Sequence, residues 1–233
     1  MTERKERVYG GVSAEKRREQ RRAALIEAGL QLFGTEGYPN VPVKKICDEA
    51  GLTQRYFYES FSDREDLLAA VYNASVEELR NATLTGAAGF LQTVPGVADG
   101  GPVPAEAIPE LARTTFGAFI DNLAQDPRRA RVILIEVVGV SPALEQLRLG
   151  AIHDWASMIL GFTPRRENPT QSDRLAAIGL VGAITQLLVD WQMAATTPIS
   201  DAAGPDLFTP EAIHDVITQM MVGIYNQVFR ADS

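Results

Sequence analysis

Apolar residues recur along most of the chain at the i, i+3, i+4, i+7 spacing of amphipathic helices. This spacing predicts a first helix from about residue 14 to residues 34–37, where two glycines end it. Two short helices follow over 43–50 and 53–60, separated by the turn Gly51-Leu52-Thr53. Capping residues predict further helices that begin near Ser62, Pro109, Pro127, Ser141, Ser172 and Thr209. We therefore expect an all-α fold.

Three segments do not follow this spacing. Residues 132–140 are β-branched enough to pass for a strand, but we predict a helix because no other segment offers a partner strand. Residues 85–104 hold five glycines and three prolines, which predict an irregular connection between helices. A second connection, rich in Pro, Gly and Asp, is expected over 196–208.

The composition excludes several classes of protein. Of the 233 residues, 45% are hydrophobic and 22% are charged, which argues against a disordered chain or a coiled-coil rod. The single cysteine, Cys47, excludes an intrachain disulfide and is expected to pack in the core. The charged N-terminus has no apolar run behind it, and the longest uncharged stretch, Leu175–Val189, is too short for a membrane span. We expect a cytoplasmic protein with no membrane partner.

Charge is divided unevenly along the chain. The net charge of −8, taken as a whole, argues against binding of a polyanion such as DNA. Residues 1–64 nevertheless carry 12 basic and 10 acidic side chains, whereas residues 65–233 carry 10 basic and 20 acidic ones. Five of the basic residues lie between Lys16 and Arg22. The sequence thus predicts a small, mildly basic head on a large acidic body.

The two short helices have the dimensions of a helix-turn-helix, whose second helix enters the major groove of DNA. Gln54, Arg55 and Tyr58 are expected on one exposed face of that second helix, where they offer hydrogen bonds to base edges and a phenol to phosphate. Basic residues at the neighbouring helices are expected to neutralise phosphates around this face: Arg22, Lys44, Lys45 and Arg64.

These residues resemble the DNA-binding domain of TetR-type (tetracycline-repressor-like) transcriptional regulators. The resemblance runs from Arg22 to Val71, over the stretches RAALIEAGLQLFGTEGY, VKKICDEAGLTQRYFYESF and SDREDLLAAVY. In that family a Gly-aromatic pair, here Gly37-Tyr38, precedes the second helix, and a Tyr-x-x-Phe pair, here Tyr58 and Phe61, closes the recognition helix.

The resemblance implies a role for each matching position. Thr53 would cap the recognition helix and touch phosphate, and Arg64 stands where the family usually has a phosphate-binding lysine. Three positions depart from the pattern: Val41 replaces a capping Thr, Ser60 replaces a common His, and Gly29 replaces an Ala. The residues implied to face the bases or the DNA backbone are Gln54, Arg55, Tyr56 and Tyr58.

The rest of the chain resembles the family in architecture, which implies a variable helical ligand-binding domain that pairs in a homodimer through its last two helices. We predict a basic arm over 1–13, a three-helix helix-turn-helix domain over 14–62, and a ligand-binding and dimerisation domain over 63–233. The long apolar stripe of the last helix independently predicts dimerisation. The residues expected in the interface are Leu187, Trp191, Ile213, Ile217, Met220, Met221 and Ile224.

An effector pocket in the body is expected to combine aromatic walls with a few polar groups. The expected lining is Phe116, Phe119, His153, Trp155 and Gln186, unless these aromatic residues serve only as core. His153 and His214 have no second ligand at metal-binding spacing and no Ser nucleophile motif beside them. No metal, cofactor or enzymatic activity is therefore expected.

The predicted function is a homodimeric, ligand-responsive regulator of transcription. It would be a repressor that leaves a palindromic double-stranded DNA operator when a small apolar or amphipathic effector binds. The alternative is an all-helical enzyme or small-molecule binding protein whose N-terminal module is not used on DNA. An activator, or a regulator without a ligand, would share the same DNA chemistry.

Overall fold

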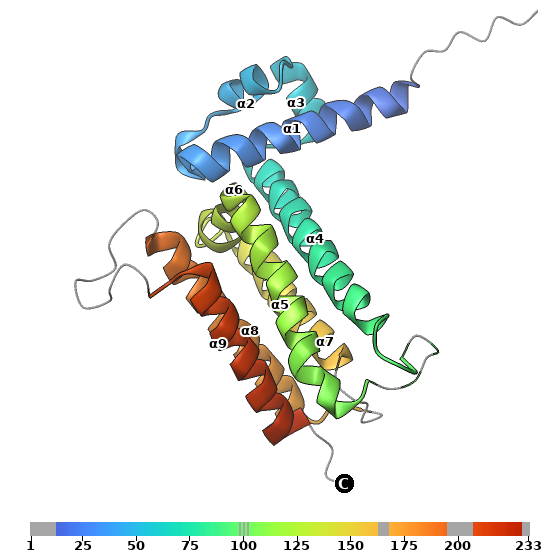
Figure 1. Ribbon diagram of the computed structural model, residues 1–233. Coiled ribbons are helices and arrows are strands. Elements are labelled where there is room, and N and C mark those ends of the chain that lie inside the picture. Colours follow the sequence, from blue (N-terminus) through green and yellow to red (C-terminus); the bar gives the residue numbers. More distant parts are fainter. Residues whose placement is uncertain are drawn as a thin grey trace, which may run out of the picture.

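A computed structural model of the chain describes residues 13–97, 99, 101, 103–162, 168–194 and 207–229 (Figure 1). Every regular element in these ranges is helical, so the expected all-α fold is confirmed. The expected arm lies outside the described residues except for Ser13, and so does most of the connection expected over 196–208.

The first three helices lie where the apolar spacing places them. Helix α1 spans Ala14–Glu36 and is capped by Ser13, whose hydroxyl accepts a hydrogen bond from the Lys16 N–H at 3.1 Å. A short 3-10 turn, η1 (Tyr38–Asn40), leads to α2 (Val43–Glu49) and α3 (Gln54–Ser60). Thr53 occupies the N-cap position of α3, but its side chain makes no capping hydrogen bond.

Helix α4 spans Arg64–Leu91 and differs from the prediction at both ends. Its cap is Asp63, which accepts from the Asp66 N–H at 2.8 Å, and not Ser62. At its other end the helix continues through Gly86 and Gly89, within the segment expected to be irregular. A Cβ at Gly86 would lie 2.6 Å from the Cβ of Ala118 on α5, so close helix packing explains a glycine inside this helix.

The remaining elements form the body of the molecule. Asp126, Ser141 and Thr209 cap their helices as predicted. Helix α8 begins one residue before the predicted cap Ser172, and Thr170 instead accepts the Asp173 N–H at 3.2 Å. The elements are η2 (Ala105–Ala107), α5 (Ile108–Gln125), α6 (Pro127–Arg131), η3 (Val132–Glu136), α7 (Pro142–Gly161), α8 (Gln171–Ala194), α9 (Pro210–Ile224) and η4 (Tyr225–Phe229).

The β-branched segment 132–140 is helical only in its first half. It forms a π-helical turn, η3, and then leaves the helix through a turn containing Gly139, whose φ is +72°. The helix predicted through residue 140 is therefore confirmed to Glu136 and wrong beyond it. Such wide turns occur often at functional sites.

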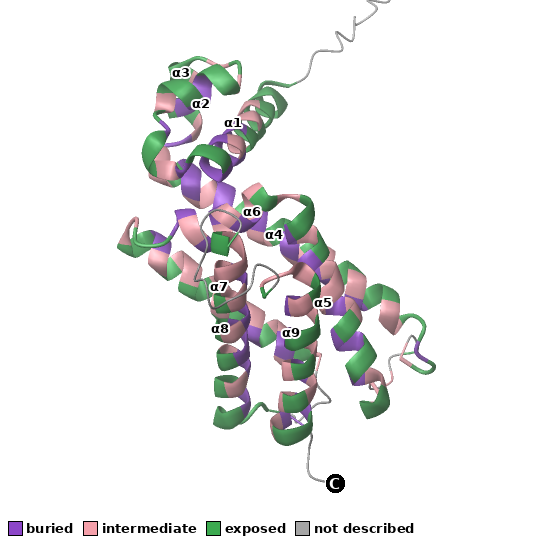
Figure 2. Ribbon diagram, turned by 60° about the vertical axis from the view of Figure 1, so that its left-hand side comes forward, coloured by how far each residue is buried: buried purple, intermediate pink, exposed green. Residues whose placement is uncertain are grey.

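Two cores meet along α4. Figure 1 shows α1 lying across the ends of α4 and α6, with α4 then running beside α5. The first turns of α4 bury Leu67 and Leu68 in the core of the head, whereas Leu79 and Ala87 join the core of the body. Val132 and Leu144 of the body also pack into the head's core. The buried residues thus continue from one part into the other (Figure 2).

Helices α8 and α9 lie side by side on one flank of the body (Figures 1 and 2). By length and a mean hydropathy of 1.4, α8 is the single described helix that could cross a membrane. Core helices of soluble proteins pass the same test, and α8 packs against α7 and α9 here.

Candidate DNA interface and effector cavity

Helix α3 presents three polar side chains to solvent from a firmly anchored backbone. Gln54, Arg55 and Tyr58 are exposed, and the Tyr58 residue is 59% accessible. On the opposite side, Phe57 is fully buried in the head's core. The Arg55 Nε lies 3.0 Å from Glu59 one turn later, in an exposed pair that a stronger partner could replace. These three side chains thus lie on the exposed surface of α3, as expected.

Basic residues of α1 brace the other side of α3. The Arg21 guanidinium lies 4.4 Å from the centre of the Tyr56 ring and 3.9 Å from the Glu59 carboxylate. The Arg22 guanidinium lies 4.9 Å from the Phe61 ring. Tyr56 is therefore half-buried under α1, although the resemblance implied that it faces bases. Cation–π contacts of this kind fix the orientation of α3 on α1.

Arg64 holds the turn before α2, so its guanidinium is already engaged within the chain. Its Nη1 donates to the carbonyl oxygens of Val41 and Tyr38 at 2.6 and 3.1 Å, and its guanidinium lies over the Tyr38 ring. Val41 itself is fully buried, which explains an apolar residue where the family has a capping Thr. Pro42 occupies the N-cap of α2 and provides no side-chain cap.

The two lysines at the start of α2 remain on the surface. Lys44 is 77% exposed at its side chain and pairs with Asp48 at 3.3 Å. Lys45 pairs with Glu36 at the end of α1. Exposed ion pairs contribute little to the free energy of unfolding. Both ammonium groups could therefore exchange their carboxylate partners for a phosphate.

A buried carboxylate joins the body to the head. Glu136, on η3, is 8% exposed, and its Oε2 accepts from the Tyr38 backbone N–H at 2.6 Å. Its Oε1 accepts from the Arg131 Nε at 2.7 Å, and Arg131 also donates to the Thr35 carbonyl at 2.9 Å. These contacts surround Gly37, whose φ of +87° favours glycine. Sequence spacing gave no signal for this link across 98 residues.

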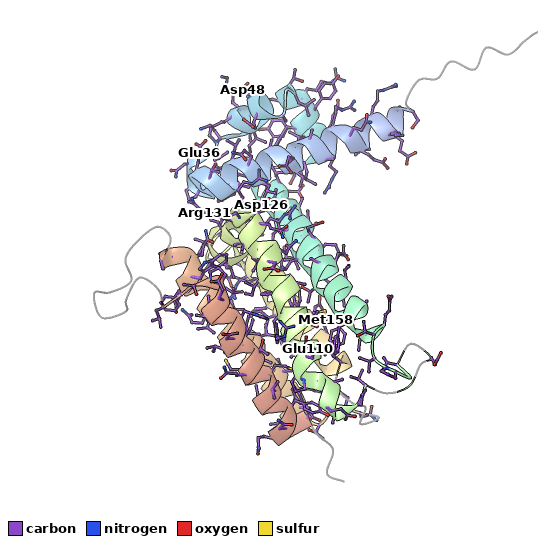
Figure 3. The ribbon with its side chains drawn as sticks, viewed as in Figure 1. Glu36, Asp48, Glu110, Asp126, Arg131 and Met158 are labelled. Carbon is purple, nitrogen blue, oxygen red and sulfur yellow. The ribbon has the colours of Figure 1, made fainter. Side chains whose placement is uncertain are left out.

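A second polar contact joins α6 to α1, next to Asp126, which is labelled in Figure 3. The Asp126 carboxylate accepts from the Arg128 Nε and Nη2, both at 2.8 Å, and these hydrogen bonds lower the pKa of Asp126. Arg128 also donates to the Gln31 side chain at 2.7 Å. Gly34 packs so closely here that a Cβ would lie 2.5 Å from that of Arg128. The head therefore rests on α6 and η3 through specific contacts.

The body contains a cavity of about 310 Å³, in the size range of small-molecule sites. Of the predicted lining residues, Phe116, Phe119, Trp155 and Gln186 do line it. Phe119 and Trp155 meet edge to face, with ring centroids 5.5 Å apart. Four helices, α4, α5, α7 and α8, supply most of the wall. The rest includes Ile133 and Leu134 of η3 and Met221 of α9.

His153 does not line the cavity. His153 precedes Trp155 by two residues on α7, and residues two apart point to different faces of a helix. His153 is therefore exposed, whereas Trp155 lines the cavity. The polar lining that sequence analysis did not single out includes Tyr72, Thr115 and Arg148. In the sequence, these residues are marked only as polar positions on otherwise apolar helix faces.

The residues predicted in the dimer interface divide into two groups. Ile213, Ile217 and Met221 are 3%, 0% and 7% exposed inside a single chain, so they cannot form a contact between chains. The strongest apolar stripe of α9 packs on α5 of its own chain. Leu187, Trp191, Met220 and Ile224 are half-buried. The exposed apolar residues on these helices include Leu175 and Val216, which are 60% and 44% accessible.

Comparison with known proteins decides the nature of the head. Residues 25–71 match the family model described as bacterial regulatory proteins, tetR family. The N-terminal domain belongs to the TetR family. Its α2 and α3 are accordingly the helix-turn-helix of a DNA-binding transcriptional regulator.

Solved structures extend the likeness of this TetR-type chain to its body. The fatty acid degradation regulator FadR from Bacillus halodurans is 16% identical, with a TM-score of 0.62 over 90% of this chain and 97% of FadR. FadR from Bacillus subtilis, in complex with stearoyl-CoA, is 16% identical, with a TM-score of 0.61 over 86% and 97%. A tetR-family regulator from Streptomyces coelicolor is 16% identical, with a TM-score of 0.60 over 87% and 78%. At this identity the likeness shows a common fold.

Proposed function

We propose that this TetR-type chain binds a palindromic DNA operator as a homodimer and represses transcription until a small apolar or amphipathic effector enters its cavity. The observation that carries the proposal is the exposed face of α3, with Gln54, Arg55 and Tyr58 on a backbone anchored by Phe57. The proposal assigns a function to three parts of the chain: a basic arm over 1–13, a DNA-binding domain over 14–62, and an effector and dimerisation domain over 63–233.

The side chains of that face match the chemistry of a base sequence. An arginine can donate two hydrogen bonds to guanine, and a glutamine can pair with adenine. Tyr58 and Thr53 would donate to the DNA backbone, and the exposed cations Arg22, Lys44 and Lys45 would neutralise phosphates. Arg64, which is engaged with two carbonyl groups, would support the domain rather than contact DNA.

Dimerisation would follow from the surface that α8 and α9 leave uncovered. Leu175 and Val216 are exposed apolar residues there, and only 28% of the most apolar window of α8 is buried within the chain. Exposed apolar side chains that gather on one surface are characteristic of protein–protein contacts. Two recognition helices about 34–36 Å apart would then enter successive major grooves, which one helix alone cannot do.

The cavity supports a mainly apolar effector. Aromatic and aliphatic side chains make up most of its wall, including Phe116, Phe119 and Trp155. The Bacillus subtilis FadR protein of similar fold binds stearoyl-CoA, which carries a long apolar chain. A molecule with an apolar part would likewise bury that part in this cavity.

The π-helical turn η3 would carry the effector signal to the DNA-binding domain. Its Ile133 and Leu134 form part of the cavity wall, and its Glu136 holds the Tyr38 N–H just before α2. An effector that displaces the wall would therefore move the contact that positions the helix-turn-helix. Effector and operator would favour different placements of η3, so each would weaken the binding of the other.

A mobility-shift assay with DNA from upstream of the chain's own gene tests the proposal. We expect binding that weakens steeply with salt, and loss of specific binding in Arg55→Ala and Tyr58→Ala. Arg174→Ala removes an exposed positive charge from α8 and is the matched control, which should bind like wild type. Binding that Arg55→Ala and Arg174→Ala reduce equally would favour the alternative, a helical small-molecule protein that does not use this module on DNA.

A further inference from the structure

Two hydroxyl-bearing residues, Thr115 and Tyr72, stand on the mainly apolar wall of the cavity. Thr115, on α5, is 8% exposed, and its Oγ1 is buried without any partner in the described part of the chain. Tyr72, on α4, is 3% exposed, and burial raises the pKa of its phenol to about 12. The phenol therefore keeps its proton at neutral pH and can act as a donor. Both residues line the cavity.

Other hydroxyl groups on the same wall are satisfied by their own helices. The Thr83 hydroxyl donates to the Leu79 carbonyl at 2.7 Å, and the Thr185 hydroxyl donates to the Val181 carbonyl at 2.8 Å. This bond to the fourth residue back is the usual solution for a threonine inside a helix. Thr115 departs from it, and its Oγ1 is buried without a partner. Rotation of the side chain would turn this oxygen toward the cavity, where a ligand that accepts its hydrogen bond would recover the free energy that the missing partner costs.

The cavity offers no unpaired charge among its described lining residues. Arg148 is the charged residue there, and its Nε and Nη2 both donate to the Glu145 Oε2, at 3.1 and 2.9 Å. A backbone hydrogen bond from Gly139 and these bonds from Arg148 lower the pKa of Glu145, so the pair is ionised and neutral in sum. An entering carboxylate would have to compete with Glu145 for Arg148, and the other described lining residues offer it no second cation, so burying it would be unfavourable.

We propose that the effector is uncharged where it enters the cavity and carries an oxygen, as in a ketone, ester or lactone, that accepts a hydrogen bond from Thr115. The rest of that part of the molecule is apolar and lies against Phe119 and Trp155. Tyr72 is the second donor, available to a further acceptor on the same molecule. This inference rests on the proposed function, because it takes the cavity to be the effector site.

Calorimetric titration of the full chain with two ten-carbon probes at pH 7.5 tests the inference without DNA. We expect 2-decanone, an uncharged ketone, to bind at least about tenfold more tightly than decanoate, its anionic counterpart. Thr115→Val, which removes the hydroxyl and keeps the shape, should weaken 2-decanone about fivefold. Thr115→Ser, which keeps the hydroxyl, should remain within about twofold of wild type. Thermal unfolding checks that both variants are folded.

Three results would overturn the inference: no binding of 2-decanone, decanoate binding as tightly as the ketone, or unchanged ketone affinity in folded Thr115→Val. The ratio of the two probe affinities is measured on the wild-type chain alone, so it tests the inference independently of the Thr115 variants. If 2-decanone binds as expected while no DNA sequence is bound, the proposed function fails and the ligand chemistry of the cavity stands.

Discussion

The Glu136 carboxylate accepts a 2.6 Å hydrogen bond from the backbone N–H of Tyr38, and so ties the wall of the cavity to the turn before the helix-turn-helix. The carboxylate is nearly inaccessible to water, and Arg131 balances its charge. A buried, fully paired acceptor of this kind fixes one arrangement of two domains more firmly than apolar packing does.

Glu136→Gln should destabilise the fold by about 1.5–3 kcal/mol, because it weakens two hydrogen bonds to a charged group in a buried site. Urea unfolding measures the change. The control is Glu27→Gln, whose carboxylate lies 3.3 Å from Arg128 but is 66% exposed, and which should lose less than about 1 kcal/mol. Equal losses of unfolding free energy in the two variants would show that the buried hydrogen bonds of Glu136 stabilise the fold no more than an exposed ion pair does.

Gly34→Ala should separate α1 from α6. The added Cβ would lie 2.5 Å from the Arg128 Cβ and 2.8 Å from its Cα, and backbone cannot move as a flexible side chain can. We expect a loss of about 1–3 kcal/mol by urea unfolding, together with weaker operator binding. Gly150→Ala, on α7 with nothing within 4 Å, should instead gain up to about 1 kcal/mol from helix propensity. A stabilised Gly34→Ala would contradict the close packing of the two helices.

Asp126 should give stability a specific dependence on pH. Its hydrogen bonds with Arg128 hold its pKa below the ordinary value of 3.8, so the ionised form stabilises the fold. That contribution is fully present above pH 3.8 and is lost as the pH falls through the lower folded-state pKa. Asp126→Asn should therefore be less stable than wild type by about 1–2 kcal/mol at pH 7. Urea unfolding across pH should show this difference shrinking below pH 3.8, and a constant difference would refute the assignment.

Val216→Glu should convert the proposed dimer to a monomer, since it places a charge at the exposed apolar surface of α9. Sedimentation velocity measures the assembly directly. Leu149→Glu makes the same change at a residue of similar exposure on α7 and should leave a dimer. A dimer in both variants would place the interface elsewhere.

The sequence predicted the parts of this fold that local patterns determine. Helix spacing and the caps at Ser141 and Thr209 are local, and the structure agrees with them. The boundaries that failed depended on tertiary packing. Helix α4 continues through Gly86 because α5 packs against that glycine, which no local pattern could show.

The candidate site was likewise predicted only in part. The exposed face of α3 follows from periodicity and family resemblance, so Gln54, Arg55 and Tyr58 lie where expected. Two of the predicted residues have a role inside the chain that the pattern did not show: Arg64 donates to carbonyl groups, and Ile217 is fully buried in the core. The link from Glu136 to Tyr38 depends on how the chain returns to the head, which spacing along the sequence does not encode.

Selection of bound duplexes from a random DNA library, followed by sequencing, tests most directly the claim that paired α3 helices read an operator. We expect an enriched inverted repeat whose half-sites are centred about 10–10.5 base pairs, or a multiple, apart. Arg55→Ala should lose specificity at one position of each half-site while keeping the spacing. No enriched sequence, or a sequence without two-fold symmetry that Arg55→Ala leaves unchanged, would contradict this account.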